Sequence, residues 1–374
     1  MSKKRFKIGF LGGGLNSTIG YIHKLASQLD SRWILEAGFF SRNKETNLKT
    51  SKLYGVSLDR TYNNFSDFIK NEKGRIDAVA VLVPTPERYK YIIQLLNNNI
   101  PIISEKPIVS EFSHCLNLKK KINNTSFLRV TYNYAGYTLI KELKSLIEKN
   151  FFGKIKQIHF EMPQDSFLKK TSKKISPKKW RLKEYYIPNI SHDLGSHLLS
   201  LTSYLINEFP SEVMCNYFES SNYKNLIDNG YLWFNFKSGI KGSFWISKSV
   251  PGIRNGLRLR IFGEKKSSEW LQTKPEELII YNDSGSIEKI DNLTFKLESH
   301  KKKYNRYKVG HPAGFLEAFA NLYYDFADQL DNHHKKKRIN KKQHLFDLKN
   351  SFYISKFFNA ASKSNKLRKW IKVL

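Results

Sequence analysis

Cysteine is scarce in this sequence of 374 residues, which contains only Cys115 and Cys215. The two are far apart and have no accompanying histidine pattern, so we expect neither a disulfide framework nor a zinc site. This usage is typical of a reducing compartment.

Long hydrophobic runs are missing as well. No run approaches the roughly 18 apolar residues of a membrane span. The basic start MSKKRFK leads into a short apolar run that breaks at Gly12, without the apolar region and cleavage site of a signal peptide. We therefore expect a cytoplasmic protein without a membrane partner.

Acidic residues are few: 33 Asp and Glu stand against 64 Lys and Arg, a net charge of +31. Such an excess would favour nucleic acid or an anionic membrane as a partner. The basic clusters are, however, scattered rather than gathered into one stripe: Lys3-Lys4-Arg5, Lys169-Lys170, Lys173-Lys174, Lys178-Lys179, Lys301-Lys302-Lys303 and Lys335 to Arg338. We interpret the charge as a compositional bias of the genome, with attraction of phosphorylated ligands as the alternative.

Apolar residues make up 40% of the chain, and its length favours two domains. The first third alternates short apolar runs with longer amphipathic ones, which predicts a doubly wound parallel sheet over residues 1–132. The expected strands are Phe6–Phe10, Trp33–Phe40, Ala78–Val83, Ile100–Ser104 and Phe127–Tyr132. The expected helices are Thr18–Leu29, Glu45–Tyr54, Tyr89–Asn98 and Glu111–Ile122.

The remaining residues, 133–374, have a different pattern. Alternating runs such as YLWFNF and LRLRIF predict an open, mostly antiparallel sheet in an α+β domain. Helices are expected at His192–Ile206, Gly314–Leu330 and Leu345–Ser362. The Lys-rich segment Ser166–Pro188 has little periodicity and is expected to form a lid-like or mobile loop.

A glycine run, Gly12-Gly13-Gly14, follows an expected strand and precedes an expected helix. In this context glycines let the backbone turn tightly and approach a pyrophosphate at the helix N-terminus. Asn16 in the same turn is a further candidate cofactor contact. Position 17 is Ser where a third small residue is expected, and a plain strand-to-helix turn is the alternative.

The end of the second expected strand offers Ser41 and Arg42. A NAD site normally places an acidic residue here for the ribose 2′-hydroxyl. A guanidinium can instead pair with the 2′-phosphate of NADP. The cofactor is therefore NADP or NAD, with NADP favoured; the alternative is that Arg42 is a solvated loop residue.

Glu105-Lys106-Pro107 comes directly after an expected strand, at the edge where open α/β sheets bind ligands. Beside an oxidised nicotinamide, a lysine becomes usable as a proton donor or acceptor. Later in the chain, Asp193 and His197 are spaced four apart at the start of an expected helix, so both project from one face. Such a pair can orient a polyol and exchange its hydroxyl proton; a helix cap followed by a core histidine is the alternative.

Taken together, the glycine turn, Glu-Lys-Pro and Asp-x-x-x-His resemble the Gfo/Idh/MocA family, named for glucose-fructose oxidoreductase and inositol dehydrogenase. The segments TYNYAGYTLIKELKSLIEKNFFGKIKQIHFEMPQDS and HPAGFLEAFANLYYDF are similar to later parts of a branch of this family, so the resemblance covers about Lys7 to Trp370. It implies a Rossmann domain followed by a domain whose open sheet often forms a subunit interface, with the active site between the two.

Site residues carried over by position follow from this resemblance. Lys106 and His197 would be the acid/base pair, and Asp193 would orient the substrate. Glu105 would lie near the nicotinamide ribose, and the peptide bond before Pro107 is commonly cis in the family. Trp180-Arg181 resembles a segment that reaches toward cofactor or substrate.

The chain also departs from the family pattern. Val83-Pro84-Thr85 stands where the family often has Thr-Pro-Asn, although Pro84, which shapes the turn and is a candidate cofactor contact, remains. The stretch YIPNISHD lacks the glycines usual before the aspartate. His192 is an additional titratable group, best interpreted as a helix-start histidine.

The predicted function is a NAD(P)-dependent oxidoreductase that transfers a hydride between nicotinamide and a hydroxyl-bearing carbon of a sugar, cyclitol or nucleotide-linked sugar. Phosphorylated substrates are included, and no metal is expected. A non-catalytic protein that senses a dinucleotide or sugar on the same fold is the alternative, and nucleic-acid binding is third. An exposed apolar face expected between Leu232 and Ile261 implies a homo-oligomer, either a dimer or a tetramer.

Overall fold

The computed structural model describes residues 3–123, 125–168, 179–292, 294, 297, 301, 303–308, 310–336 and 346–373. Part of the expected loop 166–188, namely residues 169–178, lies outside the described residues, as does the first residue of the helix expected at 345–362. The chain divides into two compact units. The first comprises Met1–Val109, Ser113–Gly136 and Gly314–Ser351, and the second Ser110–Phe112, Tyr137–Ala313 and Phe352–Leu374.

The first unit is built on a parallel sheet, as expected. Within the described residues, five strands lie in the order β2-β1-β3-β4-β5. Their bounds are β1 Phe6–Gly12, β2 Trp33–Phe39, β3 Ala78–Leu82, β4 Ile102–Ser104 and β5 Leu128–Val130. Every residue of β3 is buried, as in a parallel sheet covered on both faces. The chain order reverses between β1 and β3, and such a switch point is where doubly wound sheets bind ligands.

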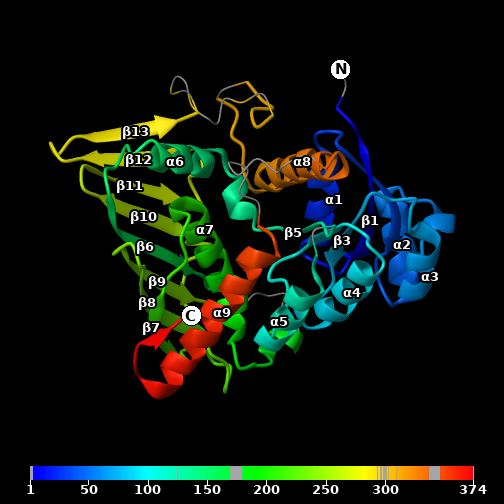
Figure 1. Ribbon diagram of the computed structural model, residues 1–374, viewed down its shortest axis with the longest axis horizontal. Helices are drawn as coiled ribbons and strands as arrows, with labels where there is room; N and C mark the ends of the chain where they lie inside the picture. The colour runs from blue at the N-terminus through cyan, green and yellow to red at the C-terminus, as the bar shows by residue number, and fades with distance from the viewer. Residues whose placement is uncertain are drawn as a thin grey trace. The chain divides into compact units, whose positions relative to one another are not determined.

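Helices lie in the connections between and beside the strands of the first sheet (Figure 1). They are α1 Gly20–Gln28, α2 Lys44–Tyr54, α3 Phe65–Glu72, α4 Thr85–Asn97 and α5 Phe112–Lys121. The helix expected to begin at Tyr89 begins four residues earlier, because Pro86 is compatible with the first helical turn. Helix α3, whose start is capped by Asn64, was not expected from the sequence pattern.

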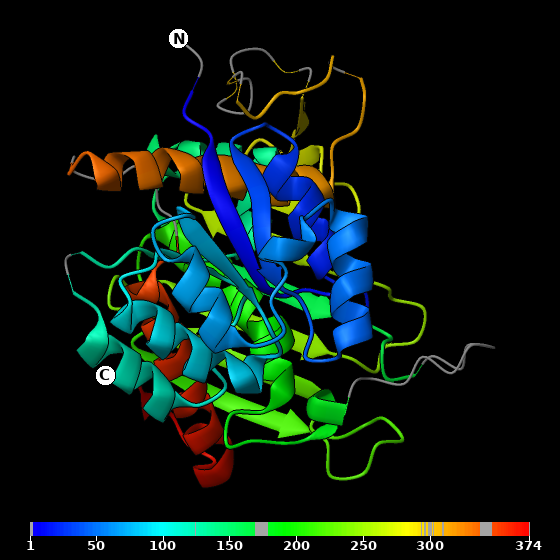
Figure 2. The same cartoon turned by 90° about the vertical axis from the view of Figure 1, so that its right-hand side faces the viewer.

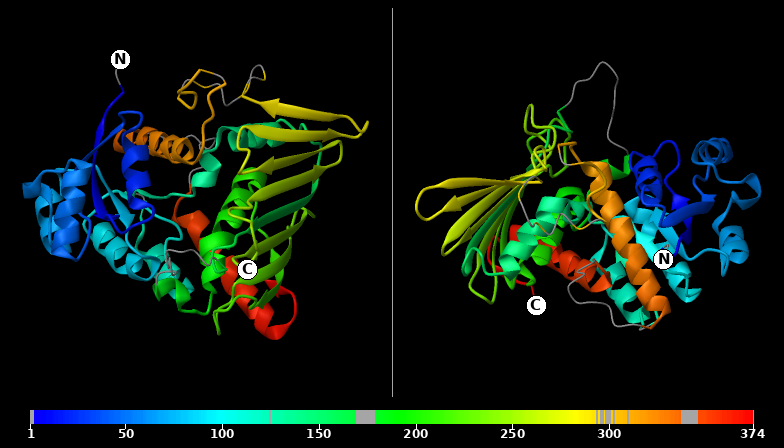
Figure 3. Two further views of the ribbon diagram at one scale, coloured as in Figure 1. Left: turned by 180° about the vertical axis from the view of Figure 1, so that it is seen from behind. Right: turned by 90° about the horizontal axis from the view of Figure 1, so that it is seen from above.

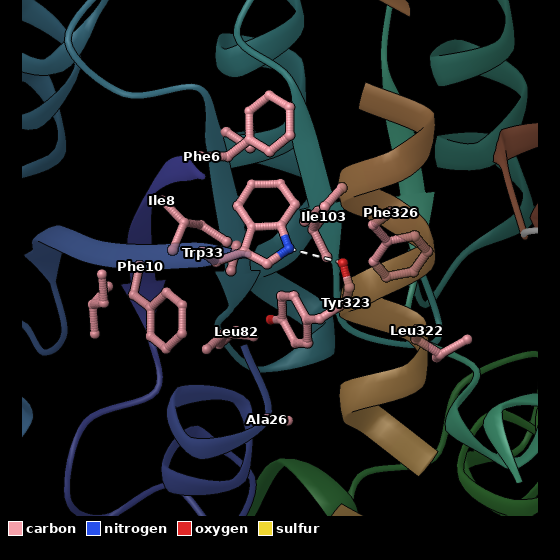
Figure 4. Packing of buried hydrophobic residues seen from close by; sticks show 14 of the residues in the cluster. Phe6, Ile8, Phe10, Ala26, Trp33, Leu82, Ile103, Leu322, Tyr323 and Phe326 are labelled. Atoms are coloured by element: carbon pink, nitrogen blue, oxygen red, sulfur yellow. Dashed lines mark hydrogen bonds between the residues drawn. The ribbon is translucent and has the colours of Figure 1, made fainter. Parts of the chain in front are cut away.

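A late helix, α8 (Phe315–His334), completes the first unit and lies beside α1 in two perpendicular views (Figures 1 and 2). Its Tyr323 and Phe326 point toward Trp33 and Ile103 in the core (Figure 4). The indole of Trp33 donates a hydrogen bond to the carbonyl oxygen of Tyr323 at 2.8 Å. The division at residue 132 would leave this helix in the second domain, whereas its contacts belong to the first unit.

The second unit is built on a large, mostly antiparallel sheet, again as expected. In the described part of the chain, nine strands lie in the order β13-β12-β11-β10-β6-β9-β8-β7-β14. The pairing of β6 with β9 is parallel, and the other pairings are antiparallel. The strand bounds are β6 Ile155–Pro163, β7 Glu212–Phe218, β8 Asn229–Asn235, β9 Lys241–Ser247, β10 Arg258–Gly263, β11 Lys266–Leu271, β12 Glu277–Asn282, β13 Ile287–Asp291 and β14 Ile371–Lys372.

One face of this sheet is covered by helices α6 (Thr138–Glu148), α7 (Ser196–Ile206) and α9 (Leu348–Leu367) (Figure 3). Alternation along the strands explains the arrangement. In β8, Leu232 and Phe234 are buried, and Phe234 contacts Phe357 of α9, whereas Tyr231 and Trp233 are 39% and 47% exposed. Among the residues that the structure describes, no helix covers the second face, which leaves it open.

Candidate active site

The glycine run forms the turn between β1 and α1. Gly12 and Gly13 have φ angles of 84° and 77°, in the left-handed region that favours glycine. A Cβ atom on Gly12 would lie 2.8 Å from the Val83 nitrogen, and one on Gly13 would lie 2.7 Å from a Leu82 methyl carbon. The turn therefore requires glycine for both its backbone angles and its space.

The third small residue of the turn is Gly20, which the sequence reasoning missed because it searched at position 17. A Cβ atom on Gly20 would lie 2.0 Å from the carbonyl oxygen of Gly13, so helix α1 packs directly against the glycine turn. Ser17 instead accepts a hydrogen bond from the Gly20 nitrogen through its hydroxyl oxygen, at 3.2 Å. Gly14 packs near the Phe40 carbonyl, and Asn16 is exposed in the turn.

These residues fit a dinucleotide. The turn is free of Cβ atoms at Gly12, Gly13 and Gly14, so a pyrophosphate can approach the backbone. It leads into the N-terminus of α1, where Ile19 at the N-cap supplies no side-chain acceptor. The positive end of the helix dipole then favours an anion. The glycine turn therefore has the space and the helix end that a pyrophosphate requires.

The end of β2 carries Ser41 and Arg42. The Ser41 hydroxyl accepts a hydrogen bond from the Asn43 nitrogen at 3.1 Å. The Arg42 side chain is 71% exposed, and its guanidinium lies 2.8 Å from a carboxylate oxygen of Glu87 on α4. Because β1 lies between β2 and β3, this ion pair connects the segment that follows β2 with the helix that follows β3. Sequence reasoning did not find Glu87, whose contact with Arg42 is made only in the fold.

Glu105 and Lys106 follow β4 at the same edge of the parallel sheet, and the Lys106-Pro107 peptide bond is cis, as the resemblance implied. Glu105 is only 7% exposed, and its carboxylate accepts a hydrogen bond from the Thr131 hydroxyl at 2.7 Å. Burial raises the pKa of Glu105, but the hydrogen bond from His23 and the nearby positive charges lower this pKa on balance.

Arg88, which the sequence reasoning missed, fixes the main chain around this turn. Its buried guanidinium donates hydrogen bonds to the carbonyl oxygens of Val83 at 2.9 Å and Glu105 at 2.8 Å, and also to that of Pro107. Burial lowers the pKa of Arg88 to about 10. The turn that holds Pro84 and the turn that holds Lys106 are therefore joined through one side chain.

Asp193 and His197 belong to the second unit. Ser191–Gly195 forms a π-helical turn that runs into α7, so Asp193 lies in the wide turn and His197 in the regular helix. His197 is 6% exposed, whereas the Asp193 side chain is 24% exposed. The wider turn changes the simple spacing of four on which a shared helix face was predicted. His192, in the same turn, is 8% exposed, and its carbonyl oxygen accepts a hydrogen bond from the Ser196 hydroxyl.

Lys248 is a further charged partner of Asp193 that sequence reasoning did not find. Its ammonium nitrogen lies 2.5 Å from Asp193 Oδ2, while its side chain is 3% exposed. Arg181 lies farther away, 3.9 Å from the same oxygen. The lysine directly after the alternating run GSFWIS was the available signal. A buried ammonium next to a partly exposed carboxylate holds the latter in one orientation.

The predicted residues thus form two groups, one in each unit. The glycine turn, Arg42, Pro84, Glu105 and Lys106 lie at the carboxyl edge of the parallel sheet. Asp193 and His197 lie at the start of α7 in the second unit.

In the described residues we find no helix long and apolar enough to cross a membrane. The same residues contain no cluster of three or more His, Cys, Asp or Glu side chains suited to a metal.

A glycine turn at the switch point of a parallel sheet is the arrangement of dinucleotide-binding proteins, and here it is followed by a unit with an open, mostly antiparallel sheet. The chain belongs to the Gfo/Idh/MocA oxidoreductase family. Residues 6–134 match the NAD-binding Rossmann fold of the oxidoreductase family, and residues 144–373 match its C-terminal alpha/beta domain.

Known relatives agree with this assignment. The uncharacterized oxidoreductase YfiI of Bacillus subtilis (strain 168) is 25% identical over 339 residues, which are 88% of this chain and 86% of the relative. An inositol dehydrogenase homolog from Azotobacter vinelandii, solved with NAD+, is 24% identical, with a TM-score of 0.91 and 99% of each chain covered. Levoglucosan dehydrogenase, solved with NADH and levoglucosan, is 16% identical, with a TM-score of 0.82 over 99% of this chain and 100% of that one. These two solved structures show the likeness of the fold.

Proposed function

We propose that this chain transfers a hydride between nicotinamide and a hydroxyl-bearing carbon of a sugar, a cyclitol or a nucleotide-linked sugar. The observation that carries the proposal is the shared edge of the glycine turn and Lys106. Gly12 pairs with Leu82 in the register of β1 and β3, and Ser104, two residues before Lys106, pairs with Val81. The glycine turn and the turn that carries Lys106 therefore follow strands that lie two positions apart in one sheet, which supports a cofactor seat near a proton-transferring residue.

The polyol class is supported by the chemistry around Asp193. A carboxylate accepts hydrogen bonds from vicinal hydroxyl groups, and Lys248 donates a hydrogen bond to this carboxylate at 2.5 Å. The inositol dehydrogenase homolog was also solved with NADH and myo-inositol, and the other relative with levoglucosan. Both ligands carry several ring hydroxyls. We extend the class to phosphorylated sugars because the chain has a net charge of +31.

The chemistry of the side chains suggests a role for each residue in the proposed reaction. When bound, the nicotinamide cofactor supplies the hydride acceptor or donor. Gly12, Gly13 and Gly14 would hold its pyrophosphate at the start of α1. Lys106 or His197 moves the hydroxyl proton of the substrate, and Asp193 orients the substrate by accepting hydrogen bonds from its hydroxyls. Holding the reacting groups together supplies most of the remaining rate enhancement.

The cofactor choice rests on Arg42. A guanidinium at the end of β2 suits a 2′-phosphate, so we propose that NADP binds in addition to NAD. Glu87 already neutralises this guanidinium at 2.8 Å. The 2′-phosphate would have to compete with that carboxylate, which weakens the preference for NADP.

We also propose that the chain forms a homo-oligomer through the open face of its large sheet. On this face the ring of Tyr231 stacks against those of Phe218, Trp233 and Trp245, with centroid separations of 5.9, 6.3 and 6.1 Å. This aromatic cluster includes the exposed rings of Tyr231 and Trp233, and such a patch is unusual on a monomer. A second copy would cover it.

The first experiment is a titration of the purified protein with NADPH and with NADH, followed by nicotinamide fluorescence at low and high salt. Saturable, micromolar binding that survives high salt is the expected result. Binding that vanishes with salt, or that any polyanion matches, would overturn the assignment of the glycine turn.

The second experiment tests the chemistry. The protein and its Lys106→Met variant are assayed with NAD and NADP against myo-inositol, levoglucosan and a series of hexoses and sugar phosphates. The variant should lose about 10²–10⁴-fold in kcat, the range for general acid–base catalysis, while keeping its affinity for the cofactor. Near-normal turnover in the variant would remove Lys106 from its role. Cofactor binding without turnover of any polyol would favour the non-catalytic sensor.

A further inference from the structure

A chain of buried polar side chains lies behind the turn that carries Lys106. His23, on α1, is 0% exposed. Its Nδ1 lies 2.7 Å from the hydroxyl of Tyr323 on α8, and its Nε2 lies 3.3 Å from Glu105 Oε1. The Thr131 hydroxyl donates to the same carboxylate oxygen at 2.7 Å. Tyr323, His23 and Glu105 therefore link α8 and α1 to the residue directly before Lys106.

The carboxylate of Glu105 fixes the direction of the hydrogen bond that it shares with His23. The lowered pKa of Glu105 favours a carboxylate, which only accepts hydrogen bonds, so Nε2 of His23 donates to it. Burial raises the pKa of Tyr323 well above its usual value, so its hydroxyl keeps its proton. Both ring nitrogens of His23 thus have a polar partner.

Packing alone does not require this arrangement. The ring of His23 meets Phe319 edge-on at 5.0 Å, in surroundings where an apolar side chain of similar size would also pack. Buried polar chains are often no more stabilising than apolar replacements, but a fully satisfied one holds its members in one geometry. The geometry held here is that of the Glu105 carboxylate.

The main chain of the same turn is held separately by Arg88, through the carbonyl oxygens of Glu105 and Pro107. Because both the carboxylate and the backbone of Glu105 are held in place, the main chain of Lys106 begins from a fixed position. In the middle of the polar chain, His23 lies one turn into α1, the helix that begins at Gly20 behind the glycine turn. The polar chain therefore connects both α8 and α1 to the residue before Lys106.

We propose that Tyr323 and His23 are positioning residues that act through Glu105 to hold Lys106 and to link it to the cofactor-binding end of α1. The inference rests on the role of Lys106 in the proposed function. It adds residues from distant parts of the chain that do not themselves touch the reacting atoms.

The test uses the Tyr323→Phe variant of the full chain, which removes one hydroxyl and keeps the ring. Its matched control is Tyr324→Phe, on the next residue of the same helix. Lys106 is acetylated with an N-hydroxysuccinimide ester, and the rate is read from its own peptide by mass spectrometry. The rate should rise about fivefold in Tyr323→Phe, the factor that corresponds to one net hydrogen bond, and stay unchanged in the control.

Thr131→Val provides a second, independent variant because it loosens Glu105 from the other side. It should move the labelling rate of Lys106 in the same direction as Tyr323→Phe. Unchanged labelling in both variants, with or without a lower melting temperature, would mean that the chain has only a structural role and would overturn the proposal.

Steady-state kinetics, measured with the polyol that gives the highest turnover, show whether the variant changes kcat or KM. Tyr323→Phe should lower kcat about fivefold, by the same hydrogen-bond argument, with KM and the Kd for NADH little changed. If wild-type protein turns over no polyol, the proposed function fails at that point. The labelling of Lys106 still decides this inference, because it requires neither cofactor nor substrate.

Discussion

In the proposed function, Glu87 and the 2′-phosphate of NADP compete for the guanidinium of Arg42, which follows β2. Replacing Glu87 by Gln removes the carboxylate 2.8 Å from Arg42 and keeps the side-chain shape. NADPH should bind up to about fivefold more tightly to this variant, the limit for an exposed ion pair, while the Kd for NADH stays the same. Fluorescence titration measures both constants.

The control is Glu45→Gln, which breaks an exposed pair with Lys49 on α2. Arg42→Gln should weaken NADPH binding and leave NADH binding unchanged. Equal NADPH affinity in wild-type protein, Glu87→Gln and Arg42→Gln would show that Arg42 does not contact the cofactor.

Glu105 gives a pH dependence whose sign follows from its environment. Because its pKa is lower in the folded protein than in the unfolded chain, the carboxylate stabilises the fold above the unfolded pKa, and this contribution is lost as the pH falls through the folded pKa. Glu105→Gln should therefore lower the free energy of unfolding by about 1.5–3 kcal/mol at pH 7, the range for hydrogen bonds to charged groups.

Urea denaturation at pH 7 and near pH 4 measures the effect. The difference between wild-type protein and Glu105→Gln should shrink at the lower pH, and the exposed control Glu45→Gln should differ little from wild-type protein at either. A difference that grows on acidification would reverse the assigned sign.

At the scale of single residues, the sequence points to candidate residues that stand in recognisable local patterns, such as Gly12 and Lys106, and their roles stay predictions. It did not reach His23, Arg88 or Lys248. Their roles depend on partners far along the chain: His23 and Tyr323 are 300 positions apart, and Lys248 and Asp193 are 55 apart. No local pattern carries that information.

Helix α1 and the glycine turn behave as one element because their backbones touch. Alanine at Gly20 would place a Cβ atom 2.0 Å from the Gly13 carbonyl oxygen, which is backbone and cannot rotate away. Gly20→Ala should lower the free energy of unfolding by about 1–3 kcal/mol, as overpacking does, and should also reduce dinucleotide binding.

Gly74→Ala is the matched control. Gly74 has a φ of 83° but no atom within 4 Å of an added Cβ, so the change strains the backbone away from the glycine turn. It should cost stability and leave dinucleotide affinity unchanged. Loss of affinity in both variants would trace the effect to general destabilisation, and loss in neither would contradict the packing argument.

Elements with a clear hydrophobic period were predicted well, including the five strands of the first sheet within a few residues. Helices α3 and α6 were missed. Helix α3 has eight residues between two loops, too short to show a sustained period. The π-turn at Ser191–Gly195 was also unforeseen, since a single wide turn of five residues is too short to show a period of its own.

At the scale of the whole molecule, the open face of the large sheet is the proposed interface of the homo-oligomer. Trp233 is 47% exposed and stacks on Tyr231 in the aromatic cluster. Trp233→Lys should convert the proposed homo-oligomer to a smaller species, because an ammonium group cannot be buried there without a partner. Light scattering coupled to size-exclusion chromatography measures the mass.

The control for this variant is Leu53→Lys on α2, a residue that is 54% exposed and lies outside the sheet. Its mass should equal that of the wild-type protein. A wild-type protein that is already monomeric, or a Trp233→Lys variant that keeps the wild-type mass, would exclude this face as the interface.

The return of α8 to the first unit has a consequence for how the protein is made. Trp33 donates its indole hydrogen bond to a residue that is synthesised 290 positions later. At the usual rates of translation the ribosome needs roughly 15–60 seconds to bridge that interval. Throughout this time the nascent first unit lacks the helix that packs against its core, so the apolar side chains that this helix covers stay exposed. For the same reason, a recombinant fragment that stops at Gly136 should aggregate unless the α8 segment is supplied with it.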